Sequence, residues 1–310
     1  MRLQTSNRIL MVRPAHFGYN AETAENNAFQ SKKAANKLKA PNEKARHEFD
    51  RFVFKLRKAG IVVEVWDDNA TVAKPDAIFP NNWLSLHQDR SIGLYPMFAP
   101  SRRKERDTRL IKWLRQSYEF DKVVDFTAME KENLFLEGTG SLVLDRTNKV
   151  AYACLSPRTD AVLMDRFCTQ FGYKKILFRA VDQNGHDIYH TNVMMAMGDD
   201  FVVICKDSIV NKQEWTALEK QFKSNKKDII TISWSQMSEY AGNMLLLRNA
   251  EEKNILVMST RAHKSLKPRQ VKQIKKYAEI LHSEVNTIEN LGGGSVRCMM
   301  AELFLEPKFY

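Results

Sequence analysis

Long apolar runs are missing from this chain, and no stretch of its 310 residues reaches the length that would span a membrane. The first residues, MRLQTSNRILMVRP, carry only a short apolar patch before Arg13 and Pro14, which is typical of a first strand and not of a signal peptide. We therefore expect a soluble, cytoplasmic protein without a membrane partner.

Cysteine is scarce. The four cysteines lie far apart, form no CxxC pair, and do not combine with histidines at the spacing of a zinc site. They are Cys154, Cys168, Cys205 and Cys298. Neither a disulfide framework nor a structural metal is indicated, so we expect reduced thiols and no bound metal.

Acidic residues are fewer than basic ones, because 37 Asp and Glu stand against 48 Lys and Arg, and the formal net charge is +11. The basic residues cluster in 31–39, 101–109, 223–228 and 263–276, mostly on expected helices or at their ends. No recognised nucleic-acid-binding motif accompanies them, and such runs are typical of solvated helix faces. We expect no nucleic-acid partner, whereas the same charge favours anionic metabolites.

The common nucleotide and hydrolase motifs GxGxxG, Walker loop and GxSxG are absent as well. What the chain has instead is a repeat of architecture without a repeat of sequence. Pairs of hydrophobic runs with strand character, each followed by a helical pattern and a further strand, recur about every fifty to sixty residues.

Five such units are expected. The first has strands within 8–14 and 61–66 and a helix from about Glu43 to Ala59, and the second pairs 77–88 with 92–97 before a helix from about Arg102 and a strand within 122–126. The third pairs 141–146 with 149–156, followed by a helix from about Thr159 to Phe171 and a strand at 175–178. The fourth pairs 192–198 with 201–207, followed by a helix around 215–222 and a strand at 229–233. The fifth pairs 244–249 with 255–260 ahead of a helix from Pro268 to Leu281, and 298–305 supplies a final strand.

The end of the chain can complete the first unit, and closure into a ring removes exposed sheet edges. The pattern therefore predicts one α/β domain over 1–310, a five-fold pseudosymmetric α/β propeller of strand-strand-helix-strand units. An ordinary two-layer α/β fold with hairpins is the alternative.

Polar residues stand where these units begin. They are Asn81, Asn82, Glu137, His190, Asn192, Asn243 and Cys298, the last of them just after the glycines 292–294. In a ring these starts converge on the axis. A thiolate needs a cationic partner and a histidine needs an orienting group, so Cys298, His190 and Glu137 make a candidate nucleophilic site. Taken singly, each has a plainer interpretation as a buried thiol, a histidine bonded to backbone, or a turn residue.

At these positions the sequence resembles the guanidine-modifying enzymes of the pentein superfamily, which include arginine deiminase and dimethylarginine hydrolase. LEGTGSLVL is similar to the motif that supplies the catalytic carboxylate, YHTN to the His-x-Asp motif, and GGGSVRCMM to the loop with the nucleophilic cysteine. The resemblance covers nearly the whole chain. It implies the five-unit propeller, a covalent thiol mechanism and no cofactor.

Three further stretches are similar to dimethylarginine hydrolases. APSRRKE (99–105) and LSPRTD (155–160) resemble segments with substrate-binding arginines, which places Arg102 and Arg158 opposite the substrate carboxylate. PDAIF (75–79) likewise implies that Asp76 contacts the α-amino group.

The chain departs from the family at two positions. Arginine deiminases have carboxylates at the end of a Phe-Thr-Arg-Asp motif and two residues after the histidine, and these grip a guanidinium. Here Asn82 and Asn192 stand at those positions. An amide is neutral and both donates and accepts hydrogen bonds, which suits a neutral ureido group, whereas a carboxylate only accepts. These residues therefore favour citrulline over arginine as substrate, and turn-filling asparagines are the alternative.

The resulting hypothesis is a citrulline hydrolase that forms ornithine, ammonia and carbon dioxide. Cys298 would attack the ureido carbon, His190 would stabilise the thiolate and protonate the departing nitrogen, and Glu137 would orient the ureido group or His190. Backbone N–H groups near Gly293 and Gly294 would stabilise the oxyanion. Which product leaves first stays open.

Several alternatives remain at this stage. Asn81 and Asn243 fit either the substrate site or turns, and 14–29 fits either a mobile flap over the site or a surface loop. The runner-up function is an arginine deiminase or dimethylarginine hydrolase that tolerates amides. An inactive pentein-fold protein that binds ribosomal RNA belongs to a different class, and its chemistry has no need of Cys298, His190 and Glu137. The oligomeric state, including a homo-oligomer, is open.

Overall fold

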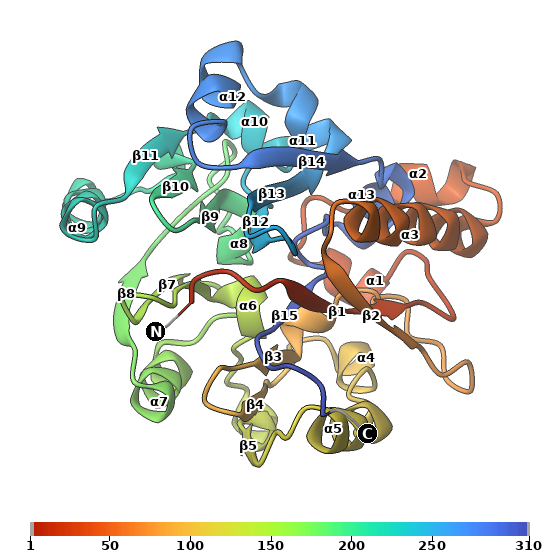
Figure 1. Cartoon of the computed structure of the whole chain (residues 1–310). Helices are drawn as coiled ribbons and strands as arrows, with labels where there is room; N and C mark the ends of the chain where they lie inside the picture. Colours follow the sequence, from red (N-terminus) through yellow and green to blue (C-terminus); the bar gives the residue numbers. More distant parts are fainter. Residues whose placement is uncertain (1–2, 309–310) are drawn as a thin grey trace.

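Five three-stranded sheets make up the fold, and each follows the same plan (Figure 1). The computed structural model describes residues 3–308. In the second unit, β3 (Leu84–Leu86) pairs antiparallel with β4 (Ser91–Leu94), and β4 pairs parallel with β5 (Lys122–Asp125). Helix α5 (Thr108–Ser117) joins the two parallel strands, because neighbouring parallel strands need a crossover.

The other units repeat this order. The third consists of β6 (Val143–Asp145), β7 (Val150–Cys154), α7 (Ala161–Phe171) and β8 (Lys174–Phe178), and the fourth of β9 (Met195–Met197), β10 (Phe201–Ile204), α9 (Lys212–Ser224) and β11 (Asp228–Thr231). The fifth consists of β12 (Leu245–Arg248), β13 (Asn254–Ser259), α12 (Pro268–Ile274) and β14 (Glu279–Ser283). The first contains β1 (Arg8–Arg13), α3 (Pro41–Lys58) and β2 (Val62–Asp67), together with β15 (Ala301–Leu303).

Short helices fill the connections between these elements. They are α1 (Ala21–Ala24), α2 (Lys32–Lys37), η1 (Pro80–Asn82), α4 (Pro100–Arg103), η2 (Thr127–Glu132), α6 (Gly138–Ser141), α8 (Thr191–Met194), η3 (Lys206–Ser208), α10 (Trp234–Ser238), α11 (Thr260–Ser265) and α13 (Asn286–Gly292).

Closure of the ring depends on the C-terminal strand. β15 pairs antiparallel with β1, with Arg8 opposite Leu303 and Leu10 opposite Ala301, so the end of the chain completes the sheet that its start began. The inner strands follow one another around the axis, with β15 beside β3, β6 beside β9, and β9 beside β12. The predicted five-unit propeller is confirmed.

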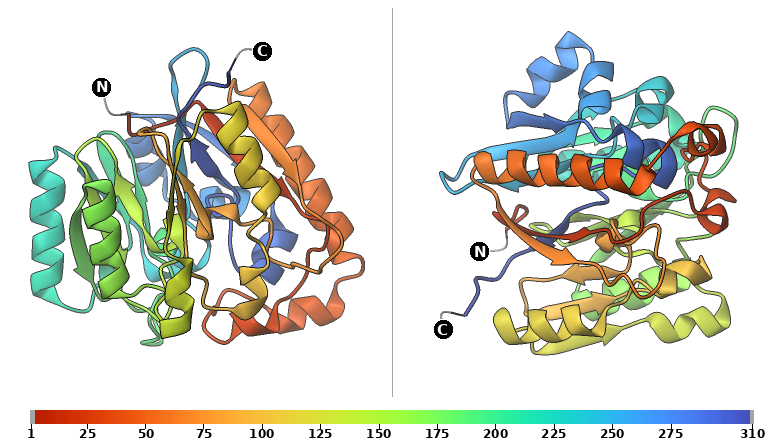
Figure 2. Two further views of the ribbon diagram at one scale, coloured as in Figure 1. Left: turned by 90° about the horizontal axis from the view of Figure 1, so that it is seen from below. Right: turned by 90° about the vertical axis from the view of Figure 1, so that its right-hand side faces the viewer.

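The long crossover helices α3, α5, α7 and α9 stand on the outside of the ring (Figure 2). Helix α7 shows how the sequence specifies such an element. Asp160 caps it by accepting hydrogen bonds from the N–H groups of Val162 and Leu163, and Gly172 ends it with a left-handed backbone (φ 67°). Leu163 and Phe167 are among the residues on its buried face, and they pack into the core of the third unit.

The predicted helix from Pro268 to Leu281 is wrong at its C-terminal end. Helix α12 ends at Ile274, and β14 then pairs in parallel with β13. Ile280 and Leu281 fit the apolar pattern of a helix, but the free edge of β13 supplies backbone partners for them as a strand. Tertiary pairing overrides the local pattern here.

The helix predicted from about Arg102 is divided in two. Helix α4 ends at Arg103, and α5 begins at Thr108 behind the capping residue Asp107, whose side chain accepts a hydrogen bond from the N–H of Arg109. The break leaves Glu105 between the two helices with its side chain buried.

No helix within residues 3–308 is long and apolar enough to cross the hydrocarbon layer of a membrane.

Candidate active site

Cys298 lies in the turn between α13 and β15, directly after the glycine loop, and is 3% exposed. Two side-chain amides approach its sulfur, because Nδ2 of Asn192 and Nδ2 of Asn243 each lie 3.4 Å from Sγ. The amide of Asn243 has a fixed orientation, since its Oδ1 accepts the backbone N–H of Arg297 at 3.0 Å. Its NH₂ group must therefore face the sulfur, and Cys298 is held by polar donors from two neighbouring units.

His190 and Glu137 form a buried pair. His190 precedes α8, Glu137 precedes α6, and Nε2 of His190 lies 2.8 Å from Oε2 of Glu137. Burial alone raises the pKa of Glu137, but the guanidinium of Arg158 and the hydrogen bond from His190 outweigh burial and hold this pKa at about 2. Glu137 is therefore a carboxylate.

The imidazole of His190 is neutral in this structure. Burial lowers the pKa of His190 to about 4, although the hydrogen bond and charge of Glu137 oppose the change. A carboxylate oxygen only accepts hydrogen bonds, so Nε2 of His190 carries the proton and Nδ1 keeps a free lone pair. Residue 140 is a glycine whose backbone packs close to this ring. A Cβ at this position would collide with the ring, because it would lie 2.8 Å from Nδ1.

Asn82, at the end of η1, presents an amide of defined orientation. Nη1 of Arg102 lies 2.7 Å from Oδ1 of Asn82, and a guanidinium has donors only, so the amide oxygen must face Arg102. The opposite side, Nδ2, is buried and has no hydrogen-bond partner. A Cβ on Gly140 would contact both this Nδ2 and the ring of His190, so the two groups border the same space.

Arg158 and Asp76 also lie at the site, and Nη1 of Arg158 lies 3.5 Å from Oε2 of Glu137. Nε and Nη2 of Arg158 donate to Oδ1 of Asn26, and Nη2 also donates to the backbone oxygen of Thr23 at 2.8 Å. Oδ2 of Asp76 accepts a hydrogen bond from Nδ2 of Asn20 at 2.7 Å, while its Oδ1 is buried without a partner. Burial raises the pKa of Asp76, against the effect of Arg102.

These side chains line a small, largely filled cavity. The predicted site residues that line it are Asp76, Asn82, Arg102, Arg158, His190, Gly293 and Cys298. Glu137 and Asn192 lie behind the wall, bonded to His190 and Cys298. The segment 14–29 folds against this cavity, with Thr23 and Asn27 in its wall, which favours the flap over the surface loop, whereas its mobility stays a prediction.

Two predicted residues take other roles. Asn81 is buried outside the cavity wall, with its Nδ2 3.3 Å from Oγ1 of Thr139. Gly293 adopts φ 65° at the end of α13, and its N–H donates to the backbone oxygen of Glu289 at 3.0 Å. That N–H is therefore not free to stabilise an oxyanion, which corrects the prediction for Gly293. Its carbonyl instead accepts the hydroxyl of Tyr189 at 2.7 Å.

Sequence reasoning left Asn243 undecided and missed Glu105. Asn243 begins the fifth unit just as the other site residues begin theirs, and that position was a usable signal. Glu105 sits in the charged run 101–109, where nothing in the sequence separates an inward carboxylate from solvated ones. Within residues 3–308, no group of three or more His, Cys, Asp or Glu side chains is arranged to hold a metal ion.

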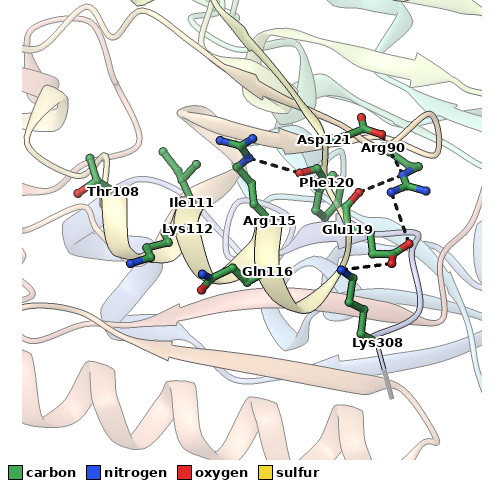
Figure 3. Close-up of a pocket in the computed structure, with 10 residues that line it drawn as sticks. All are labelled: Arg90, Thr108, Ile111, Lys112, Arg115, Gln116, Glu119, Phe120, Asp121 and Lys308. Atoms are coloured by element: carbon green, nitrogen blue, oxygen red, sulfur yellow. Dashed lines mark hydrogen bonds and ion pairs between the residues drawn. The ribbon is translucent and has the colours of Figure 1, made fainter. Parts of the chain in front are cut away.

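A larger, open depression lies on the outer surface beside α5 (Figure 3). Its charged side chains are largely paired with one another, since Arg90 reaches Glu119 and Asp121, and Lys308 reaches Glu119. Unlike the axial cavity, its wall has no cysteine or histidine. The candidate active site is therefore the smaller cavity, whose wall contains Cys298 and His190.

A sequence model of one protein family, described as N,N dimethylarginine dimethylhydrolase, eukaryotic, matches residues 13–305. No curated protein matches the sequence significantly.

Solved structures share this fold over nearly the whole chain. ArgZ, an arginine dihydrolase from the ornithine–ammonia cycle in cyanobacteria, gives a TM-score of 0.76 at 14% identity and covers 97% of this chain but 41% of its own. The substrate-bound N-terminal domain of ArgZ gives a TM-score of 0.73 at 14% identity, covering 96% of this chain and 99% of that domain. A dimethylarginine dimethylaminohydrolase adduct with S-methyl-L-thiocitrulline gives 0.65 at 17% identity, covering 97% and 100%.

The chain thus spans 41% of the length of full-length ArgZ. At these identities the similarity establishes the fold, which is that of the pentein enzymes.

Proposed function

This chain belongs to the family of eukaryotic-type N,N dimethylarginine dimethylhydrolases, pentein-fold hydrolases of carbon–nitrogen bonds, and on that premise we propose that its substrate is citrulline. The overall reaction is citrulline plus water to ornithine, ammonia and carbon dioxide.

The observation that carries this proposal is the amide of Asn82. Its oxygen is engaged by Arg102, and its buried Nδ2 has no partner, so the cavity offers a donor that needs an acceptor. The ureido oxygen of citrulline is such an acceptor, whereas every polar group of an arginine guanidinium is a donor. An unpaired buried donor facing a second donor costs about 1–3 kcal/mol, which disfavours arginine. Asn192 does not line the cavity, and its Nδ2 lies 3.4 Å from Sγ of Cys298, so its amide lies beside the nucleophile.

In the first chemical step, Sγ of Cys298 attacks the ureido carbon while the neutral His190 takes the thiol proton on Nδ1. The developing oxyanion accepts a hydrogen bond from Nδ2 of Asn82, a donor that is already in place. The imidazolium, held by Glu137, then protonates the departing nitrogen. A thiocarbamate on Cys298 remains.

Water then hydrolyses this thiocarbamate, with His190 accepting a proton from the water molecule and the thiol of Cys298 being restored. The product is a carbamate, which loses carbon dioxide. If ammonia leaves first, the carbamate is that of ornithine, and if ornithine leaves first, it is that of ammonia. Both orders give the same products.

Two charged residues of the cavity suit the amino-acid end of citrulline. Oδ1 of Asp76 would bind the α-ammonium group, and Arg158 would bind the α-carboxylate through the edge that Asn26 and Thr23 now occupy. Arg102 also lines the cavity, but its Nε and Nη2 edge, which could bind a carboxylate through two hydrogen bonds, is held by Glu105 in this structure.

The test is product analysis after incubation with citrulline, arginine or dimethylarginine, with Cys298→Ala as the control. We expect equal amounts of ornithine and ammonia from citrulline, and no product from the two guanidinium substrates. Citrulline formed from arginine or dimethylarginine, or ornithine formed from arginine, would overturn the assignment of a ureido substrate.

A further inference from the structure

Glu105 is a buried carboxylate that the proposed mechanism does not use. Its side chain reaches inward from the break between α4 and α5, and the residue is 5% exposed. Oε1 and Oε2 of Glu105 accept hydrogen bonds from Nε and Nη2 of Arg102, both at 2.8 Å. This is the two-bond geometry that fixes a guanidinium in one plane.

The guanidinium of Arg102 connects Glu105 to the substrate cavity. Its Nε and Nη2 edge faces Glu105, Nη2 also lies 3.3 Å from the backbone oxygen of Phe79, and Nη1 donates to Oδ1 of Asn82 at 2.7 Å. Because the group is planar and rigid, holding one edge at Glu105 fixes the direction in which Nη1 points.

Other carboxylates compete for Arg102. Nε lies 4.0 Å from Asp76, and Nη1 lies 4.0 Å from Glu137. Without Glu105, the guanidinium is free to turn toward either of these, and the substrate carboxylate would be a further competitor. The hydrogen bond from Arg102 to Oδ1 of Asn82 would then be lost. The amide of Asn82 could present its oxygen to the cavity as readily as its NH₂ group.

We propose that Glu105 is a positioning residue for substrate selectivity: it holds Arg102 against Oδ1 of Asn82, and thereby keeps the NH₂ group of Asn82 directed at the ureido oxygen. This inference rests on the proposed ureido substrate. It assigns Glu105 and Arg102 to recognition of the reacting end of the substrate and not of its amino-acid end.

The experiment compares two ligands that share one end. Citrulline carries the α-amino and α-carboxylate groups together with the ureido group, whereas ornithine has the same amino-acid end and no ureido group. For wild type and Glu105→Gln, kcat/KM is measured for citrulline, and the inhibition constant is measured for ornithine as a competitive inhibitor. Gln keeps the shape of Glu105 but places an NH₂ donor against one N–H of Arg102.

A matched control is available in η2, whose Glu130 pairs with the residue after Glu105. Glu130 pairs with Arg106 through both carboxylate oxygens, at 2.5 and 3.1 Å, and neither residue lines the cavity. Glu130→Gln breaks an equivalent pair and is expected to leave both constants within about twofold of wild type.

For Glu105→Gln we expect kcat/KM for citrulline to fall about tenfold or more, the effect of losing one well-placed hydrogen bond, while the ornithine constant stays within about twofold. The loss should disappear when Asn82 is already Ala, since two residues that act through one another are not additive. If Glu105→Gln does not fold, Glu105→Asp carries the same comparison with a shorter carboxylate.

Three results overturn the inference: an unchanged kcat/KM, an equal loss for citrulline and ornithine, or a full Glu105→Gln effect on the Asn82→Ala background. Failure of the proposed function is a separate observation, because wild type would then release no ornithine from citrulline.

Discussion

The Nε2 atom of His190 donates its hydrogen to Oε2 of Glu137 over 2.8 Å, and both side chains are buried. This bond selects the tautomer of the imidazole and leaves Nδ1 without a proton, and in the proposed mechanism Nδ1 takes the thiol proton of Cys298. In the proposed mechanism, the carboxylate also stabilises the imidazolium that forms when the thiol of Cys298 gives up its proton. A base that is neutral at rest and stabilised once protonated is suited to both halves of the reaction.

Replacing Glu137 with Gln tests this role. The amide keeps the shape of the side chain but removes the negative charge, so the imidazolium loses its partner in the buried site. We expect kcat for citrulline to fall about 100-fold or more, within the range of general acid–base contributions. Steady-state kinetics measure the effect, and circular dichroism confirms that the variant is folded. Activity within a few-fold of wild type would remove Glu137 from the chemistry.

The protonation of His190 predicts a pH dependence of stability. Its pKa is lowered from 6.5 to about 4 in the folded protein, first because of burial, so the unfolded chain binds more protons between these values. The contribution of His190 to the free energy of unfolding therefore decreases as the pH falls from about 6.5 to about 4. Denaturant unfolding of wild type and His190→Asn, compared at several pH values, isolates this contribution. A difference between the two proteins that stays constant or grows on acidification contradicts it.

Asn82→Asp changes the character of the cavity from donor to acceptor. The carboxylate cannot donate to a ureido oxygen, and it adds negative charge beside the reacting carbon. We expect a loss of about 100-fold in kcat/KM for citrulline, comparable to removal of one oxyanion donor. The same variant should gain measurable turnover of arginine, because a carboxylate pairs with a guanidinium. Parallel assays with citrulline and arginine measure both changes. Retained turnover of citrulline by Asn82→Asp would contradict the prediction.

Asn26 competes with the substrate for Arg158. Its Oδ1 accepts from Nε and Nη2, the edge that suits an α-carboxylate. Asn26→Ala removes this competitor, so we expect KM for citrulline to decrease about two- to fivefold with little change in kcat, in line with one hydrogen bond. A raised KM would show instead that Asn26 contributes to substrate binding.

The regular units of the fold were predictable from the sequence. Continuous apolar runs such as 150–154 and 201–204 form strands that are buried on both faces, and their turns and helices follow in a fixed order. The strand β14 was not predictable from the sequence, because Ile280 and Leu281 fit a helix as well as a strand. Only pairing with the edge of β13 decides between the two.

The site could be predicted where residues stand at the start of a unit, since ring closure brings those starts together. Cys298, His190 and Asn82 illustrate this, and all three line the cavity. Glu105 could not be found in this way. It belongs to a run of charged residues, and its inward direction results from the break between α4 and α5, which depends on local capping by Asp107.

The measurement that tests the central claim most directly follows the ureido carbon itself. Citrulline labelled with carbon-13 at that atom is incubated with the protein, and nuclear magnetic resonance records where the label goes. The account predicts that the label appears in carbon dioxide and bicarbonate at the rate at which ornithine forms, and that Cys298→Ala abolishes both. Label that stays in citrulline while arginine or dimethylarginine is consumed would contradict it.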